Sequence, residues 1–358
     1  MWATRLDTIR PWPGPRASTS SPARCCSIFP TNIRSISNFP LPCTAGPVTD
    51  GARPALPAMP LIPPLPPSVT LRDAAPDYPV LEISHPRATA RVALHGGHLM
   101  EWIPAGQAPV LYLSPRAVLR EGKAIRGGVP VCWPWFGNHP AGGEYPAHGV
   151  ARTRFWNCES ASESPEGVRL VLTLKDDEAT RRLWSHPFEL RLTLAIGQTL
   201  ELSLTMQHLG KVPAVFQAAL HSYFSVGDIR RVTVRGLDHT GYFTEVGPPQ
   251  TQGEHTQHGD IVIDREVDRQ YHAAPEVRLA DASLSREIVI TGTGSSATVV
   301  WNPWIEKAAR LADLPDTDYR SFLCIETACL STSSRLELRP GGSHTMSARI
   351  QCQPLDAG

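Results

Sequence analysis

From about Val69 onward, apolar and polar residues alternate along the chain with a period of two. The segments 190–196 and 200–206 alternate without interruption, as Leu-Arg-Leu-Thr-Leu-Ala-Ile and Leu-Glu-Leu-Ser-Leu-Thr-Met. A strand with this pattern buries one face and exposes the other, as the strands of antiparallel sheets do. The short segment 197–199 between them contains a glycine and predicts a tight hairpin.

Weaker versions of this pattern predict strands through most of the remaining chain. We expect them at 89–94, 168–174, 214–220, 286–291, 297–301, 322–326 and 345–352. Helical patterns are few, and the best covers 176–184. Turns are expected at Gly341-Gly342 and at 292–296, which we interpret as a hairpin turn because no helix follows its glycines. Many strands with short connections, and no internal repeat, predict one all-β domain: a large antiparallel β-sandwich or a barrel.

Residues 1–68 have a different composition from the rest of the chain. They are rich in Pro, Ser, Arg and Ala and almost free of acidic residues, so we expect a disordered or weakly packed extension and a folded domain over 69–355. Two other interpretations stay open: a mis-assigned start, with Met59 as the true initiator, and a targeting segment. The prolines that begin at Pro11 argue against an amphipathic transit helix.

Charge and cysteine usage narrow the functional class. Lys+Arg and Asp+Glu are both 34, so the formal net charge is zero, whereas a general nucleic-acid binder carries a basic excess. The eight cysteines include no Cys-x-x-Cys spacing, which argues against a zinc site or a disulfide framework. No apolar run reaches the roughly 18 residues of a membrane helix. We expect a cytoplasmic protein that binds neither nucleic acid nor membrane.

Two basic segments could bind an anion. In Arg126-Gly-Gly-Val-Pro, flexible backbone lies beside a guanidinium group, which suits bidentate phosphate binding; the alternative is an ordinary surface arginine. The aromatic residues that follow, to Gly137, could line a sugar site or form a buried plug between sheets. His148, Arg152 and Arg154 follow soon after and, with Arg126, could surround a dianion unless they are simply solvated.

Two further residues could perform acid/base chemistry. His221 ends an apolar run, and an imidazole titrates near neutral pH, although a histidine there can also be a satisfied core residue. Glu326 follows the apolar run 322–325, where burial of a carboxylate is costly unless it is paired or functional. A raised pKa would suit a general base, and a structural ion pair is the alternative. Trp301, in the aromatic turn 299–304, could shape the rim of a sugar cleft or plug the end of a sheet.

Taken in order, these segments resemble the glucose-6-phosphate 1-epimerases, or hexose-6-phosphate mutarotases, a branch of the aldose 1-epimerase superfamily. The resemblance spans roughly residues 80–352. The matching segments are Gly96-Gly-His98 with Trp102, Arg126-Gly-Gly-Val-Pro, Trp135-Phe-Gly137, His148-Gly-Val-Ala-Arg152, Leu183-Trp-Ser-His-Pro-Phe188, Leu220-His-Ser-Tyr-Phe224, Val300-Trp-Asn-Pro-Trp304 and Cys324-Ile-Glu326.

The resemblance implies a galactose mutarotase-like supersandwich whose concave face holds the site. It implies an isomerase that interconverts the α and β anomers of glucose 6-phosphate or a related hexose 6-phosphate, by acid/base ring opening and closure. A small sugar phosphate would be the only partner of a monomer, with no metal or organic cofactor. The implied residues are His221 and Glu326 as the catalytic pair and, for substrate binding, Arg126, Arg152, His148 and Trp301.

Two positions depart from the family pattern. Family members usually carry Gln before the His-Gly pair and Asp in a Tyr-x-Asp element, and here these positions are Ala147 and Thr244, with Glu245 as a neighbouring carboxylate. The departures favour an alternative function, a catalytically weak carbohydrate-phosphate-binding protein on the same fold. A mutarotase of free aldoses is disfavoured by the arginines. A lyase or glycosidase is disfavoured because only one compact site is evident.

Overall fold

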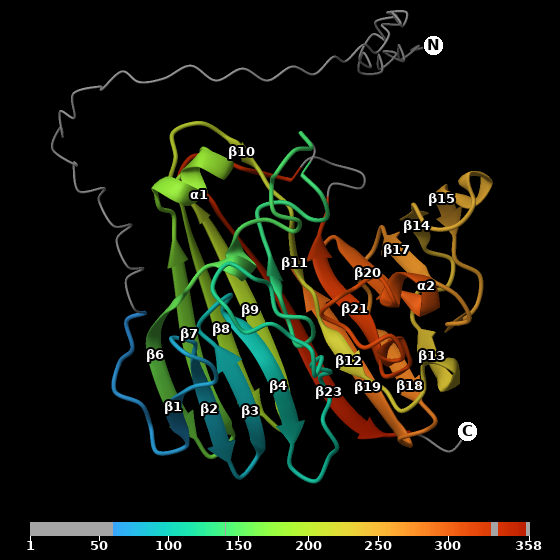
Figure 1. Cartoon of the computed structure of the whole chain (residues 1–358), viewed down its shortest axis with the longest axis horizontal. Coiled ribbons are helices and arrows are strands. Elements are labelled where there is room, and N and C mark those ends of the chain that lie inside the picture. Colours follow the sequence, from blue (N-terminus) through green and yellow to red (C-terminus); the bar gives the residue numbers. More distant parts are fainter. Residues whose placement is uncertain (1–59, 140, 331–335, 356–358) are drawn as a thin grey trace, which may run out of the picture. The chain divides into compact units, whose positions relative to one another are not determined.

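The alternating segments form long neighbouring strands of one large sheet (Figure 1). The strands β7 (Gly167–Lys175), β8 (Phe188–Gly197) and β9 (Thr199–His208) pair in antiparallel order, and β8 and β9 are joined by the expected hairpin. The computed structural model describes residues 60–139, 141–330 and 336–355. The expectations for residues 1–59 lie outside this range.

Nine strands make up this sheet, in the order β16-β13-β18-β19-β23-β9-β8-β7-β6. The strands not yet placed are β6 (Asn157–Ser164), β13 (Val232–Arg235), β16 (Ile261–Val262), β18 (Val277–Asp281), β19 (Arg286–Thr293) and β23 (Ser343–Pro354).

An eight-stranded sheet has the order β15-β14-β17-β20-β21-β11-β5, with β12 also paired to β21. Its strands are β5 (Val131–Cys132), β11 (Ala218–Leu220), β12 (Tyr223–Ser225), β14 (Gly241–Thr244), β15 (Gly253–Thr256), β17 (Val267–Tyr271), β20 (Ala297–Asn302) and β21 (Phe322–Cys329). Every residue of β21 is buried, because neighbouring strands flank it on both sides and other parts of the fold cover both faces.

Two smaller sheets complete the β-structure. One has four strands in sequence order and the other has two. They are β1 (Val69–Asp73), β2 (Pro79–His85), β3 (Ala88–Ala93) and β4 (His98–Pro104), and the pair β10 (Ala214–Val215) and β22 (Glu337–Leu338). All these strand pairs are antiparallel, which confirms the predicted fold class.

The sheets share one hydrophobic core. The four-stranded sheet lies in front of β7–β9 in Figure 1, and fully buried Trp102 of β4 belongs to the same cluster as Leu192 of β8, Leu204 of β9 and Phe322 of β21. Full burial of one such leucine contributes about 1.5–3 kcal/mol. The alternate apolar residues that define the strands in the sequence are therefore the ones that hold the sheets face to face.

Two sequence predictions were wrong where the chain moves between sheets. The expected strand 214–220 is two strands, β10 and β11, because β10 pairs with β22 while β11 pairs with β21 and β5. The expected hairpin at 292–296 is a crossover, since β19 lies in the nine-stranded sheet and β20 in the eight-stranded one. Gly294 has φ +66°, and a Cβ there would collide with the carbonyl oxygen of Thr345.

Helices are short and few. The α-helices are α1 (Glu178–Leu183) and α2 (Trp304–Ala308), and the 3₁₀ helices are η1 (Ala151–Thr153), η2 (Ile229–Arg231), η3 (Pro249–Thr251) and η4 (Asp318–Arg320). Helix α1 falls within the predicted segment 176–184. In the part of the chain that the structure describes, no helix has the length and apolarity to cross a membrane.

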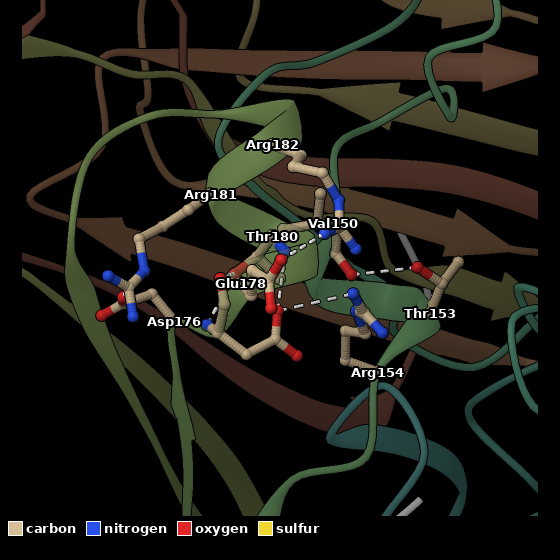
Figure 2. A network of polar contacts seen from close by, with 9 residues as sticks. Val150, Thr153, Arg154, Asp176, Glu178, Thr180, Arg181 and Arg182 are labelled. Carbon is tan, nitrogen blue, oxygen red and sulfur yellow. Dashed lines mark hydrogen bonds and ion pairs between the residues drawn. The ribbon is translucent and has the colours of Figure 1, made fainter. Parts of the chain in front are cut away.

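A capping box begins α1. The Asp177 carboxylate accepts a hydrogen bond from Thr180 N at 2.6 Å, and the Thr180 hydroxyl accepts one from Asp177 N at 2.8 Å. Figure 2 shows Arg154 directed at this end of the helix, and its Nη2 lies 3.6 Å from Asp177 Oδ1. Arg154 therefore pairs with the start of α1, although the sequence had placed it among the basic residues that could surround a dianion.

Residues 60–68 precede the first strand and lie against β6. Leu61 N donates to Asn157 Oδ1 at 2.9 Å, and Leu61 O accepts from Cys158 N at the same distance. Ile62 and Leu65 pack against the hydrophobic core. We therefore propose that the folded domain begins near residue 60 rather than at 69.

Candidate active site

Strand pairing brings His221 and Glu326 together. The strands β11 and β12 pair with successive parts of β21, and His221 lies in the short connection between them, opposite Glu326. The His221 Nδ1 atom lies 3.3 Å from Glu326 Oε1. The Glu326 side chain is 1% exposed and that of His221 is 8% exposed. The pair is therefore largely shielded from water, and the imidazole is the more accessible of the two groups.

Aromatic groups surround the His221 imidazole. The Tyr223 ring stacks on it with centroids 4.8 Å apart and planes 11° apart. The His148 ring contacts it edge-on at 5.6 Å, and the Trp301 ring does so at 5.9 Å. Two of the predicted substrate-binding residues, His148 and Trp301, therefore adjoin the predicted catalytic pair.

Arg126 reaches the site through Tyr223. Its Nη1 donates to Tyr223 Oη at 3.1 Å, and its Nε donates to Asp313 Oδ1 at 3.1 Å. The backbone that follows it requires glycine: Gly128 has φ +60°, and a Cβ there would lie 2.7 Å from His98 Nε2. Because the backbone at Gly128 packs closely against the four-stranded sheet, the position of Arg126, two residues earlier, is constrained.

Arg152 and His148 also lie near the pair. The Arg152 Nη2 donates to Ala147 O at 2.8 Å, and its buried Nε has no hydrogen-bond partner among the described residues. His148 Nδ1 accepts a hydrogen bond from Gly137 N at 3.2 Å. The unused donor of Arg152 and its positive charge suit an anionic ligand.

Burial and neighbouring charges favour the neutral forms of both members of the pair. Burial lowers the pKa of His221 well below its usual value, and the positive charges of His148, Arg152 and Arg126 lower it further. Burial raises the pKa of Glu326 well above its usual value, Asp268 raises it further, and Arg152 acts in the opposite direction.

These shifts favour a carboxylic acid beside a neutral imidazole. The expected starting state, a carboxylate beside an imidazolium, contains the same number of protons. The two states differ only in which group carries the single proton, so the pair can supply one acid and one base in either arrangement.

No sequence pattern marked Asp268 as a site residue. It lies on β17 directly opposite Trp301 of β20, so the two side chains share one face of the sheet. Burial raises the pKa of Asp268 to about 6, although the Lys307 ammonium opposes this shift. Lys307 Nζ lies 3.9 Å from Asp268 Oδ2 and 2.9 Å from Glu266 Oε1. The strand Val267–Tyr271 is short and does not alternate clearly, which is why the pattern failed to mark it.

Of the other aromatic candidates, Trp133 lies in the core and Phe136 lies at the site. Trp133 is 1% exposed and packs against Phe188 at 4.3 Å and Trp184 at 4.6 Å, as the buried-plug alternative predicts. Phe136 instead contacts the His148 ring at 4.8 Å. Of these two residues, only Phe136 therefore borders the site.

The two departures from the family pattern offer backbone or local contacts only. Ala147 contributes its carbonyl oxygen, which accepts from Arg152. The Thr244 hydroxyl accepts from Val246 N at 3.2 Å. The negative charge of Glu245 contributes to the raised pKa of Asp268, so this carboxylate lies near the same part of the site. Among the described residues, no three His, Cys, Asp or Glu side chains are grouped as metal ligands.

Comparison with known proteins gives consistent results. The family model described as "Aldose 1-epimerase" matches residues 79–351. A relative from Escherichia coli K12 named "Putative glucose-6-phosphate 1-epimerase" is 34% identical over 283 residues, covering 79% of this chain and 94% of the relative.

Solved structures extend the likeness to the fold. The crystal structure of a "putative mutarotase (YeaD)" from Salmonella typhimurium has a TM-score of 0.75 and 32% identity, covering 83% of this chain and 97% of that one. A "galactose mutarotase-like protein" from Clostridium acetobutylicum has a TM-score of 0.63 at 12% identity, covering 80% and 98%. The second likeness shows the fold alone, and the expected galactose mutarotase-like fold is confirmed.

Proposed function

The chain belongs to the aldose 1-epimerase family and is an isomerase, and from this premise we propose that it interconverts the α and β anomers of a hexose 6-phosphate. Glucose 6-phosphate or a related sugar is the proposed substrate. The observation that carries the proposal is the contact of His221 Nδ1 with Glu326 Oε1 at 3.3 Å, in a site that also contains two arginines.

Anomer exchange needs one acid and one base at the same time. Ring opening removes the proton of the anomeric hydroxyl and delivers a proton to the ring oxygen; rotation about C1–C2 and closure reverse these transfers. We assign Glu326 as the base on the hydroxyl and protonated His221 as the acid on the ring oxygen. A group that starts each turnover as acid must end it as base, and the pair contains one transferable proton in either arrangement, which supports the assignment.

The phosphate has two roles in this proposal. It gives Arg126 and Arg152 a dianion to bind, which fixes the sugar ring relative to the acid/base pair. It also offsets the positive charges of Arg152 and Arg126, which add to the effects of burial and of His148 in lowering the pKa of His221. Bound phosphate therefore raises the pKa of His221 and favours the imidazolium–carboxylate state that ring opening requires.

The remaining polar and aromatic groups bind the sugar itself. The rings of Trp301 and His148 both lie edge-on to the His221 imidazole, at centroid distances of 5.9 and 5.6 Å. Asp268 lies on the same sheet face as Trp301, where its carboxyl group is placed to accept hydrogen bonds from sugar hydroxyls. These contacts fix which carbon faces Glu326.

Anomer-exchange NMR on glucose 6-phosphate tests the proposal, with free glucose measured alongside. The full chain should accelerate exchange of the phosphorylated sugar more than that of glucose. His221→Ala and Glu326→Gln should each lower the accelerated rate on the order of 10²–10⁴-fold, with near-native circular dichroism. Exchange at close to the wild-type rate in either variant would refute the assignment of that residue.

A catalytically weak carbohydrate-phosphate-binding protein is the second candidate. It is favoured by Ala147, which offers only its carbonyl oxygen, and by Thr244, whose hydroxyl bonds to local backbone. Isothermal titration calorimetry that detects glucose 6-phosphate binding, together with no rate enhancement by NMR, would establish this function in place of the first.

A further inference from the structure

Tyr223 touches both the anion-binding arginine and the acid/base pair. Its phenol oxygen accepts a hydrogen bond from Arg126 Nη1 at 3.1 Å, and its ring stacks on the His221 imidazole with planes 11° apart. The residue is 2% exposed. A single buried side chain therefore forms the direct connection between Arg126 and His221.

Among the described residues, Arg126 donates side-chain hydrogen bonds to Asp313 and Tyr223 only, which leaves one edge of its guanidinium group free. Its Nε donates to Asp313 Oδ1, and the backbone oxygen of Asp313 accepts from the Ser114 hydroxyl at 2.6 Å. A guanidinium group has five N–H donors, and Asp313 and Tyr223 use two of them. The three donors that remain are on Nη1 and Nη2, which together form an edge suited to bidentate phosphate binding.

The two members of the acid/base pair are close together but are not in good hydrogen-bond geometry. His221 Nδ1 and Glu326 Oε1 are 3.3 Å apart, yet Nδ1 makes no well-directed hydrogen bond to any described residue. Catalytic hydrogen bonds are often long or misdirected in unliganded enzymes and tighten when substrate binds. The hydrogen bond from Arg126 to Tyr223 and the stack of Tyr223 on His221 form one contact route that can influence how the imidazole meets Glu326.

We propose that Tyr223 is a positioning residue that couples phosphate binding at Arg126 to the orientation of the His221 imidazole. A phosphate on the free edge fixes the guanidinium group, the Nη1–H···Oη hydrogen bond fixes the tyrosine ring, and the stack fixes the imidazole relative to Glu326. This inference rests on the proposed function and adds that the phosphate accelerates the chemical step as well as tightening binding.

Tyr223→Phe isolates the coupling, because it keeps the stacked ring and removes only the phenol oxygen. We expect kcat for glucose 6-phosphate to fall about tenfold, the loss expected when a hydrogen bond to a charged group disappears. We expect kcat/KM for free glucose to stay within about twofold, since no phosphate engages Arg126. The glucose rate also reports whether the variant is folded. Tyr271→Phe removes another buried phenol of the same sheet, bonded to Gln257 Oε1, and should leave both rates unchanged.

Two outcomes would overturn the coupling while leaving the proposed function intact. If Tyr223→Phe raises KM for glucose 6-phosphate and leaves kcat unchanged, the phenol only tethers Arg126. If the rates for both sugars fall by the same factor, the phenol acts on the pair without regard to phosphate. A wild-type chain that accelerates neither sugar would instead refute the proposed function, and the coupling with it.

Discussion

Replacing Glu326 with glutamine is expected to remove catalysis and to make the fold more resistant to rising pH. Glutamine has nearly the same shape as the protonated carboxyl group that the buried site favours, and it cannot ionise. The Glu326 side chain is 1% exposed, and its Oε2 has no hydrogen-bond partner among the described residues. Ionisation there has to overcome desolvation with little local compensation.

The size and sign of the effect follow from proton linkage. The pKa of a glutamate in an unfolded chain is about 4.3. In the folded chain the pKa of Glu326 lies well above this value. Between the two values the folded state binds more protons than the unfolded state, so the wild-type free energy of unfolding falls as pH rises. The loss approaches about 1.4 kcal/mol for each pH unit inside this window, and Glu326→Gln does not undergo it.

Urea unfolding of both proteins at several pH values between 5 and 8, followed by tryptophan fluorescence, measures the difference. His221, whose folded pKa is lowered, adds stability as pH rises toward about 6.5 in both proteins, so this contribution largely cancels. Glu201→Gln removes an exposed carboxylate from the outer face of β9 and controls for the loss of one charge. Parallel pH profiles for wild type and Glu326→Gln would show that burial does not hold this carboxyl group protonated.

Two further substitutions test the anion site and the turn that carries His148. Arg126→Ala should raise KM for glucose 6-phosphate by about 10–100-fold, the cost of losing a charge-assisted contact, and should also lower kcat for this sugar if Tyr223 couples the arginine to His221. It should change free-glucose kinetics little; Arg154→Ala is the matched control, and equal effects on both sugars would exclude a phosphate role for Arg126. Gly149→Ala should lower the free energy of unfolding in urea by more than Gly143→Ala, because both glycines have φ +78° but only at Gly149 would a Cβ collide, with the carbonyl oxygen of Trp133. Equal losses would show that the turn can relax.

Hydrophobic periodicity predicted the strands that have one face in the core and one in solvent. The segments that became β8 and β9 are such strands, and their pattern follows directly from the alternation of side chains along a pleated backbone. Short strands such as β12 and β17 carry too few residues to show a period. The crossover at 292–296 was misjudged because a glycine-rich turn has the same composition whether it joins paired strands or strands of two different sheets.

The sequence by itself determined the all-β class, the principal strands and, through resemblance, the chemical types of the site residues. Tertiary structure decided what those residues can do. Pairing of β11 and β12 with β21 sets His221 beside Glu326, and burial together with nearby arginines decides which of the two holds the proton. Contacts and pKa values depend on groups that segments distant along the chain bring close together in space. Those distances cannot be read from local patterns of residues.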